Sequence, residues 1–147
     1  MPTLLNVNNY HYRRGGADVM FLEQSRLFKE VGWNVAAFSM NHPNNEPSEW
    51  SGYFVDEIEF GFDYSQLQKA VRVARVIYSR QARLQLWRLL DKVKIDIAHV
   101  HNVYHHISPA ILGLLKSQGI PVVLTTHDLK IACPASVSYT HLRAHET

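Results

Sequence analysis

The hydrophobic pattern of this chain alternates between short apolar runs and longer stretches of helical periodicity. The short runs predict strands at residues 3–7, 33–39, 95–100 and 121–126. The longer stretches predict helices at residues 17–32, 65–94 and 108–118. Residues 53–60 are expected to hold a short strand or an irregular segment. Because strands and helices alternate with short links, the sequence predicts an α/β fold in which helices flank a parallel sheet.

Residues that begin and end helices sharpen these boundaries. Ser108 is expected to be the N-cap of the last predicted helix, with Pro109 in its first position. Gly32 and Gly119 are expected to end the helices that precede them. The pattern of the long helix predicted over residues 65–94 allows a break near Ser79.

Polar side chains stand at the carboxyl ends of two predicted strands, and both strands read as buried. His101 and Asn102 follow the third strand, and His127 and Asp128 follow the fourth. In open α/β sheets, ligands bind in the crevice outside the carboxyl ends of the strands. We therefore expect these side chains to border one ligand site.

A pair of glycines, Gly15 and Gly16, separates the first predicted strand from the first helix. Glycines at this place let a ligand approach the backbone closely, and the free N–H groups of the following helix attract an anion. The segment lacks the spacing of the dinucleotide-binding and P-loop motifs, so neither chemistry is expected. A plain tight turn with a solvent-exposed Arg14 accounts for the same residues. The glycine pair alone therefore does not distinguish a ligand-binding loop from a turn.

The histidines of the third strand admit two interpretations. In the first, His99 and His101 alternate across the strand end and point to opposite faces of the sheet, His99 toward the core and His101 into the cleft. In the second, they bind a metal together with His105 and His106. No cysteine or carboxylate lies near enough in the sequence to complete a typical zinc set, so no metal is expected.

His127 has the chemistry of a functional histidine at neutral pH. Its ring can donate a hydrogen bond to a sugar hydroxyl or a phosphate, or move a proton. Asp128 either orients that ring or begins the next turn. A helix-capping Asp128 beside an incidental His127 explains the dipeptide equally well.

The composition is that of an ordinary globular protein, and the net charge argues against a nucleic-acid partner. It has 147 residues, which favours one domain, with 46% hydrophobic and 19% charged residues. The formal net charge of +2 is too small to indicate a nucleic-acid partner. Cys133 is the single cysteine, which rules out an internal disulfide and fits a reducing compartment. With neither a signal-peptide pattern nor an apolar stretch of membrane-spanning length, the expected location is the cytoplasm.

Charge is unevenly distributed over the middle of the chain. Residues 46–63 contain six acidic residues and no basic one, whereas residues 69–94 contain eight basic residues and one acidic residue. On a helix, one side would carry the basic residues Lys69, Arg72, Arg80 and Arg83. Such a helix over residues 66–94 can make peripheral contact with anionic lipid at the inner membrane. The alternative is a solvated face that pairs with the acidic segment.

The last eleven residues do not continue the pattern. Residues 137–147 lack periodicity and resemble the conceptual translation of a transposon-based sequencing adapter. We therefore expect a native domain over residues 1–136, cut short, and a non-native tail over residues 137–147. On this expectation His141 and His145 carry no function, although their spacing would suit a metal.

Four segments together resemble the N-terminal half of a family 4 glycosyltransferase of the GT-B type. The segments are RGGA at residues 14–17, DIAHVHN at 96–102, YHHISPA at 104–110 and THDLKIACP at 126–134. The resemblance covers about residues 3–135. It implies a Rossmann-like parallel sheet that forms the incomplete, acceptor-side half of a GT-B fold. In such enzymes a second Rossmann-like domain binds most of the nucleotide-sugar donor, and this sequence contains no counterpart of that domain.

The resemblance also implies roles for residues at the strand ends. Gly15 and Gly16 would approach the donor diphosphate or the acceptor. His127 would act as the catalytic residue that contacts the transferred sugar and supports the developing charge. The donor or acceptor site would be lined further by Arg14, Asn102, Asp128 and, on the acceptor side, His101.

The implied function is transfer of a hexosyl group, with retention, from a nucleotide-sugar donor to a glycan or glycolipid acceptor. The implied process is surface polysaccharide synthesis, without a metal or other cofactor. A non-catalytic module that binds a nucleotide sugar or carbohydrate stays open as the alternative, and a His-rich metalloprotein is a remoter one. Because half of the cleft is missing, the 147-residue chain is expected to fold poorly and to lack transferase activity.

Overall fold

The computed structural model describes residues 1–56, 79–104 and 107–127. In chain order the elements are β1 (Thr3–Val7), α1 (Gly16–Glu30), β2 (Asn34–Phe38), η1 (Ser51–Tyr53), α3 (Arg80–Lys92), β3 (Ile97–Val100), α4 (Ala110–Ser117) and β4 (Val122–Leu124). The strands and helices predicted among these residues are present. Their bounds differ from the expected ones by no more than frayed ends normally produce.

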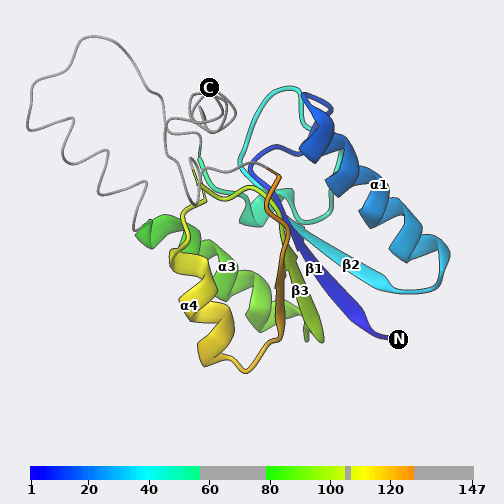
Figure 1. Ribbon diagram of the computed structural model, residues 1–147. Helices are drawn as coiled ribbons and strands as arrows, with labels where there is room; N and C mark the ends of the chain where they lie inside the picture. Colours follow the sequence, from blue (N-terminus) through cyan, green and yellow to red (C-terminus); the bar gives the residue numbers. More distant parts are fainter. Residues whose placement is uncertain (57–78, 105–106, 128–147) are drawn as a thin grey trace, which may run out of the picture.

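The strands form one sheet in which every pair is parallel, in the order β2-β1-β3-β4. Helix α1 covers one face of this sheet, and α3 and α4 cover the other (Figure 1). Helices on both faces of a parallel sheet make a Rossmann-like α/β arrangement. The predicted fold class is therefore confirmed.

Strand β1 lies inside the sheet and is covered on both faces. All of its residues are buried, and it pairs with β2 on one side and β3 on the other. Leu5 and Val7, two positions apart, lie on the face of the sheet that meets α3 and α4. Asn6 lies on the opposite face, where its side-chain amide donates to the Phe21 carbonyl of α1 at 3.0 Å. A polar residue in an apolar strand thus finds its partner on the backbone of a helix.

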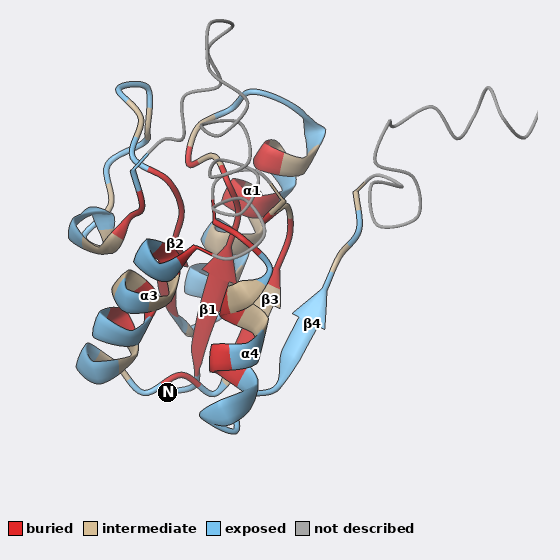
Figure 2. Ribbon diagram, turned by 90° about the vertical axis from the view of Figure 1, so that its left-hand side faces the viewer, coloured by how far each residue is buried: buried red, intermediate tan, exposed pale blue. Residues whose placement is uncertain are grey.

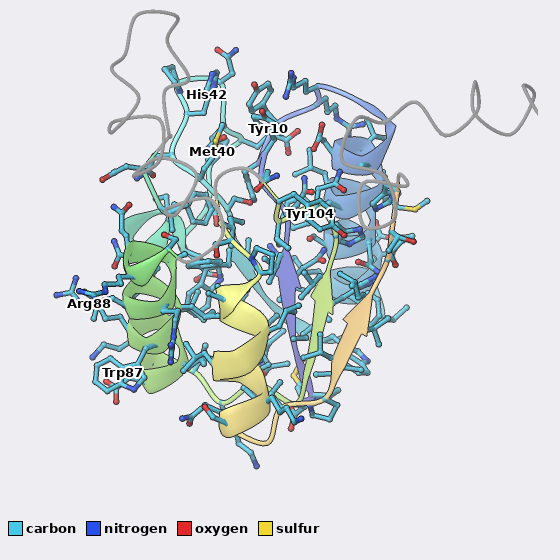
Figure 3. The ribbon with its side chains drawn as sticks, turned by 60° about the vertical axis from the view of Figure 1, so that its left-hand side comes forward. Tyr10, Met40, His42, Trp87, Arg88 and Tyr104 are labelled. Atoms are coloured by element: carbon cyan, nitrogen blue, oxygen red, sulfur yellow. The ribbon has the colours of Figure 1, made fainter. Side chains whose placement is uncertain are left out.

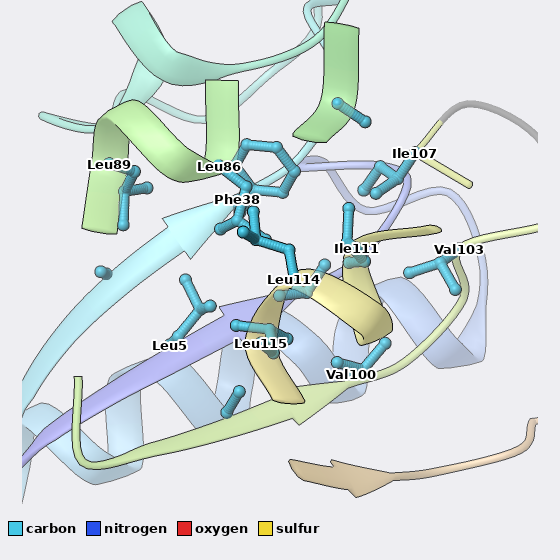
Figure 4. Close-up of a cluster of buried hydrophobic side chains, with 14 of the residues drawn as sticks. Leu5, Phe38, Leu86, Leu89, Val100, Val103, Ile107, Ile111, Leu114 and Leu115 are labelled. Carbon is cyan, nitrogen blue, oxygen red and sulfur yellow. The ribbon is translucent and has the colours of Figure 1, made fainter. Parts of the chain in front are cut away.

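The main hydrophobic core lies between the sheet and the helix pair α3 and α4 (Figure 4). Helix α3 contributes Leu86 and Leu89, and α4 contributes Ile111 and Leu115, all fully buried. Burying one such side chain stabilises a fold by about 1.5–3 kcal/mol. This core holds α3 and α4 against the inner strands, whose carboxyl ends carry the site described below.

Helix α3 begins at the break expected near Ser79. Ser79 has extended backbone angles, and its Oγ accepts a hydrogen bond from the Ala82 N–H at 3.1 Å. This side-chain N-cap satisfies one of the free N–H groups at the start of the helix. The earlier part of the predicted helix, residues 65–78, lies outside the described residues.

Left-handed backbone conformations follow two helices, as expected of terminating glycines. Gly32 has φ +87° after α1, and Gly119 has φ +69° after α4. The start of α4 differs from the prediction, because Pro109 is the N-cap and Ala110 is the first helical residue. Ser108 lies one position earlier with φ +80°, outside the helical path. Its Oγ nevertheless accepts from the Ala110 N–H at 3.2 Å.

The prediction that the fourth strand is buried is wrong (Figure 2). Val122, Val123 and Leu124 are 37%, 47% and 40% exposed. Among the described residues, β4 is an edge strand that pairs with β3 alone. Its apolar sequence is typical of an inner strand, and such a pattern cannot show whether a neighbouring element covers it.

The segment between β2 and α3 is largely irregular as far as the structure describes it. After η1, an isolated parallel bridge joins Met40 to Val55. Phe54 is buried and packs with Phe21 of α1. This agrees with the irregular alternative for residues 53–60, of which 57–60 lie outside the described residues.

Candidate functional site

The carboxyl ends of β1, β3 and β4 meet at one edge because these strands are parallel neighbours. Figure 3 shows Tyr10 and Tyr104 beyond the ends of β1 and β3. His101 follows β3 directly, and His127 follows β4 after two further residues. The strand ends that the sequence analysis singled out therefore share the edge at which α/β sheets bind ligands.

His127 is joined to the interior by a short chain of hydrogen bonds. Its Nε2 lies 2.8 Å from Nδ1 of His101. On the other side of the His101 ring, Nε2 lies 3.1 Å from Oδ1 of Asn6 and 3.0 Å from Oε1 of Gln24. His101 is 1% exposed, whereas His127 is partly exposed. The chain of bonds thus runs from the core to the surface.

A second chain of hydrogen bonds begins at the same glutamine. Nε2 of Gln24 lies 2.6 Å from Nδ1 of His99, and Nε2 of His99 lies 2.6 Å from the Thr125 hydroxyl. The rings of His99 and His101 have centroids 4.2 Å apart and planes inclined by 27°. Gln24 of α1 therefore contacts both histidines, and His99 connects it to the residue after β4.

The prediction that His99 and His101 point to opposite faces is wrong. Successive side chains alternate along a strand, so residues two positions apart share a face. Both rings lie on the α1 side, where His99 meets Gln24 and His101 packs edge-on against Phe21. His101 is also nearly inaccessible to solvent, so it lies behind His127 and not in an open cleft.

Burial sets the charge of these rings. Desolvation, aided by the nearby rings of His99 and His127, lowers the pKa of His101 to about 3. Burial and the neighbouring His127 also lower the pKa of His99. Both rings are therefore neutral at pH 7, and each carries one N–H and one lone pair. Each ring can therefore accept a hydrogen bond at one nitrogen and donate one at the other without placing a charge in the interior.

The glycine pair forms the start of α1. Gly15 is the N-cap, extended at φ −153°, and no side chain among the described residues caps this helix. A Cβ atom on Gly16 would meet nothing within 4 Å, and one on Gly15 would meet Asp18 Oδ2 at an ordinary 3.7 Å. Arg14 lies over the ring of Tyr10, 4.4 Å from its centroid. The described residues thus leave room beside the free N–H groups of the helix.

A buried hydrogen-bonded pair ties the start of α1 to the end of β3. Asn8 donates from Nδ2 to Oδ1 of Asp18, in the first turn of α1, at 2.7 Å. Oδ1 of Asn8 accepts from the Asn102 N–H at 3.3 Å. The helix dipole favours a carboxylate in the first turn. Asn8 therefore holds the glycine loop and Asn102 in one arrangement.

These elements and the residues at their ends match a known family. The family model for Glycosyltransferase Family 4 matches residues 14–145, which is most of the chain. The chain belongs to Glycosyltransferase Family 4. The resemblance carried by the four sequence segments is thereby confirmed, and the described sheet is that of a family 4 N-terminal domain. No curated protein matches this chain.

The extent of the Glycosyltransferase Family 4 match bears on the domain bounds. It begins after β1, and it runs past residue 136 into the segment predicted to be a non-native tail. That segment lies outside the described residues, so the boundary at 136 stays a prediction. Strand β1 precedes the match and is placed in the domain by its pairing with β2 and β3.

The structure groups the site residues predicted for this family 4 domain in two places. The ends of β3 and β4 carry His101, Asn102 and His127. The start of α1 carries Arg14, Gly15 and Gly16. Outside the described residues lie Asp128, His105 and His106. No group of three or more histidine, cysteine or carboxylate side chains is arranged to hold a metal ion in the part of the chain that the structure describes.

Two residues of this candidate site were not predicted from the sequence. Asn6 interrupts an apolar strand, and this was an available signal, because a buried amide needs a hydrogen-bond partner. Gln24 lies among polar positions of α1 and gave no comparable signal. Oδ1 of Asn102 is buried and has no hydrogen-bond partner among the described residues.

Proposed function

We propose that this chain is the acceptor-side half of an enzyme that transfers a hexosyl group from a nucleotide sugar to a glycan or glycolipid. The proposed transfer retains the anomeric configuration, serves surface polysaccharide synthesis, and uses the nucleotide sugar as substrate with no separate cofactor. Membership of Glycosyltransferase Family 4 supports sugar transfer in general. The arrangement around His127 supports a contact between this residue and the transferred sugar.

The observation that carries the proposal is the position of His127 at the carboxyl edge of the sheet. Its Nε2 is bonded to buried His101, so Nδ1 is the ring nitrogen outside this chain of bonds. A fixed imidazole can hydrogen-bond a sugar hydroxyl, and it can stabilise charge that develops as the bond to the nucleotide breaks. We therefore assign His127 the contact with the transferred sugar.

The start of α1 supports a substrate that carries a diphosphate. Free N–H groups and the helix dipole attract an anion at this end of a helix. Gly15 and Gly16 leave the space that a phosphate needs, and exposed Arg14 adds a positive charge. Asn8 ties this helix end to the end of β3, and we propose that one ligand contacts both the glycines and the strand ends.

Binding is tested by comparing Gly16→Ala with Gly52→Ala in the purified chain. At both positions a Cβ would meet nothing within 4 Å, so both variants are expected to fold. UDP-glucose or GDP-mannose is titrated into the ¹⁵N-labelled protein while the amides of residues 15–18 and the His127 ring are observed. We expect one donor to shift these signals, and Gly16→Ala to weaken its binding about tenfold, or about 1.4 kcal/mol. The proposal fails if neither donor shifts them, or if Gly16→Ala binds like Gly52→Ala.

Turnover is tested on the full-length protein that the source gene encodes. The anomeric configuration of the product, read by NMR, shows retention or inversion. His127→Ala is expected to lower kcat by about 10²–10³, the usual effect of removing one group that stabilises developing charge. Specific donor binding with no turnover would instead favour a non-catalytic module that binds nucleotide sugars.

We also propose that α3 makes peripheral contact with the inner membrane from the cytoplasmic side. Leu84 and Trp87 are 54% and 53% exposed, and Arg88 projects outward beside Trp87 (Figure 3). Exposed apolar and basic side chains on a helix suit an anionic lipid surface. Of the predicted basic stripe, Arg80 is exposed and Arg83 partly buried, while Lys69 and Arg72 lie outside the described residues. Among the described residues, no helix is both long and apolar enough to cross a membrane.

Co-sedimentation with vesicles of phosphatidylcholine and phosphatidylglycerol tests this contact. Trp87→Ala is expected to reduce the bound fraction. Leu27→Ala is the matched control, because Leu27 is 51% exposed on α1, on the other face of the sheet. Equal binding by the two variants would contradict contact through α3.

A further inference from the structure

The hydrogen bonds around His101 determine which ring nitrogens carry a hydrogen along the chain of hydrogen bonds that ends at His127. We propose that Asn6 and Gln24 are positioning residues that hold His101 in its Nε2–H tautomer. His101 in turn orients His127 with Nε2–H directed inward and Nδ1 left to meet a hydroxyl of the ligand. This inference rests on the proposed function, in which His127 contacts the transferred sugar.

The orientation of the Asn6 amide is decided by a helix backbone. One end of this amide lies 3.0 Å from the Phe21 carbonyl and 2.9 Å from the Ser25 hydroxyl. A carbonyl oxygen can only accept, so the Asn6 atom facing it is the NH₂ nitrogen. The oxygen of Asn6 consequently faces His101 and accepts from it.

The hydrogen of neutral His101 must then be on Nε2. This nitrogen lies 3.1 Å from Oδ1 of Asn6, and a lone pair on it would face the lone pairs of that oxygen. The same N–H lies 3.0 Å from one end of the Gln24 amide, so that end is the oxygen. The NH₂ end of Gln24 therefore faces Nδ1 of His99 and donates to it at 2.6 Å.

The remaining protons follow in the same way. Nδ1 of His101 carries a lone pair, so Nε2 of His127, 2.8 Å away, donates its hydrogen to it. Nε2 of His99 carries the hydrogen of that ring and donates to the Thr125 hydroxyl at 2.6 Å. All three rings are then Nε2–H tautomers, and the Phe21 carbonyl determines this through Asn6 and Gln24.

The consequence for the ligand is specific. A neutral His127 presents Nδ1 as an acceptor, so it selects a ligand group that donates, such as a sugar hydroxyl. When His127 takes up a proton, the hydrogen bond from Nε2 to the lone pair of His101 is retained and strengthened. His101 thus stabilises either state of His127 without being charged itself.

The wild-type protein provides the first test. Long-range ¹H–¹⁵N spectra of the ¹⁵N-labelled chain at pH 8 distinguish the two neutral tautomers from each other and from the cation. We expect His99, His101 and His127 each to show the Nε2–H pattern. The inference is overturned if His101 carries its hydrogen on Nδ1, or if His127 averages between tautomers.

Gln24→Glu tests the assignment of the glutamine amide. The carboxylate keeps the shape of the side chain and cannot donate to His99. We expect His99 to move its hydrogen to Nδ1 while His101 keeps Nε2–H, because the carboxylate and Asn6 both still accept from it. An unchanged His99 would contradict the assignment.

His101→Phe tests whether His101 orients His127. His11→Phe is the matched control, because His11 is 7% exposed and also packs against Phe21, but contributes nothing to this chain of bonds. We expect His127 to change from one tautomer to an average of both in His101→Phe and to stay unchanged in His11→Phe. If His101→Phe does not fold, the wild-type spectra and Gln24→Glu still decide. A His127 ring that responds to neither UDP-glucose nor GDP-mannose would count against the proposed function and leave the proton positions intact.

Discussion

At the scale of single residues, His101 shows how a polar side chain is kept in the core. Both ring nitrogens have partners, Asn6 and Gln24 on one side and His127 on the other. A buried polar group left without partners costs roughly 1–3 kcal/mol, and a buried charge costs more. Because the ring is neutral, it avoids the cost of a buried charge. Its three hydrogen-bond partners offset the cost of burying a polar group.

The same burial makes stability depend on pH. Histidine in an unfolded chain titrates near 6.5, whereas the pKa of folded His101 is lowered to about 3. Between these values the unfolded state binds one more proton than the folded state. The contribution of His101 to the free energy of unfolding is therefore fully present above about pH 6.5 and is lost as the pH falls toward 3. His101 is expected to contribute a loss of about 1.4 kcal/mol per pH unit.

Urea unfolding between pH 7 and pH 4 measures this effect. The lowered pKa values of His99 and His11 add to the slope in wild-type protein. His101→Phe should therefore show a shallower dependence of the unfolding free energy on pH than wild type. Equal slopes for His101→Phe and wild type would show that His101 is not a buried neutral ring.

At the scale of elements, α3 depends on the residue that begins it. Ser79→Ala removes the hydroxyl that accepts from the Ala82 N–H. We expect the free energy of unfolding to fall by about 1 kcal/mol, the usual effect of losing a serine N-cap. Exposed Ser51→Ala is the control, with an expected change within about 0.5 kcal/mol. Chemical denaturation of both variants measures the difference, and equal values would contradict the cap.

Strand β4 should tolerate polar substitution where an inner strand does not. Val123 is 47% exposed on β4, whereas Val100 is fully buried on β3. Val100→Thr is expected to lower stability by about 1–3 kcal/mol because it buries a hydroxyl. Val123→Thr should change stability by less than about 0.5 kcal/mol and reduce association through the edge of β4, with which no described strand pairs.

Denaturation and light scattering on the two variants measure these effects. A loss at Val123→Thr as large as that at Val100→Thr would mean that β4 is covered in solution.

The elements predicted from sequence are those with a local signal. Apolar runs and terminating glycines placed β1, α1 and the end of α4, because periodicity and backbone preference act over a few residues. The exposure of β4 was not predictable, since it depends on whether another element covers the strand. His99 and His101 could have been placed on one face by the alternation of strand side chains alone. Their partner Gln24 lies more than seventy residues away in sequence, and only tertiary packing brings it to them.

At the scale of the whole molecule, the site is built from one edge of one sheet. The glycines lie at the start of helix α1, which also supplies Gln24. The other members of the chain of hydrogen bonds lie in β1 and β3 or directly after β3 and β4. His127 is only partly buried at this edge. Transfer of a sugar to an acceptor requires water to be kept away from the reacting bond.

We therefore expect the purified 147-residue chain to show no turnover. UDP-glucose and GDP-mannose are incubated with the protein, and release of UDP or GDP is measured against a buffer control. Circular dichroism during the assay shows whether the chain is folded, and it thereby tests the expectation from the sequence that the chain folds poorly. Nucleotide release above the control, abolished by His127→Ala, would contradict this expectation.

The pairing of β1 with β3 has a consequence for biosynthesis. Leu4 of β1 pairs with Ile97 of β3, 93 positions later in the sequence. The ribosome therefore releases the central strand long before its second neighbour has been translated, and contacts this distant in sequence form slowly. Until then the nascent polypeptide presents one unpaired side of an apolar strand, which is the kind of segment that chaperones retain.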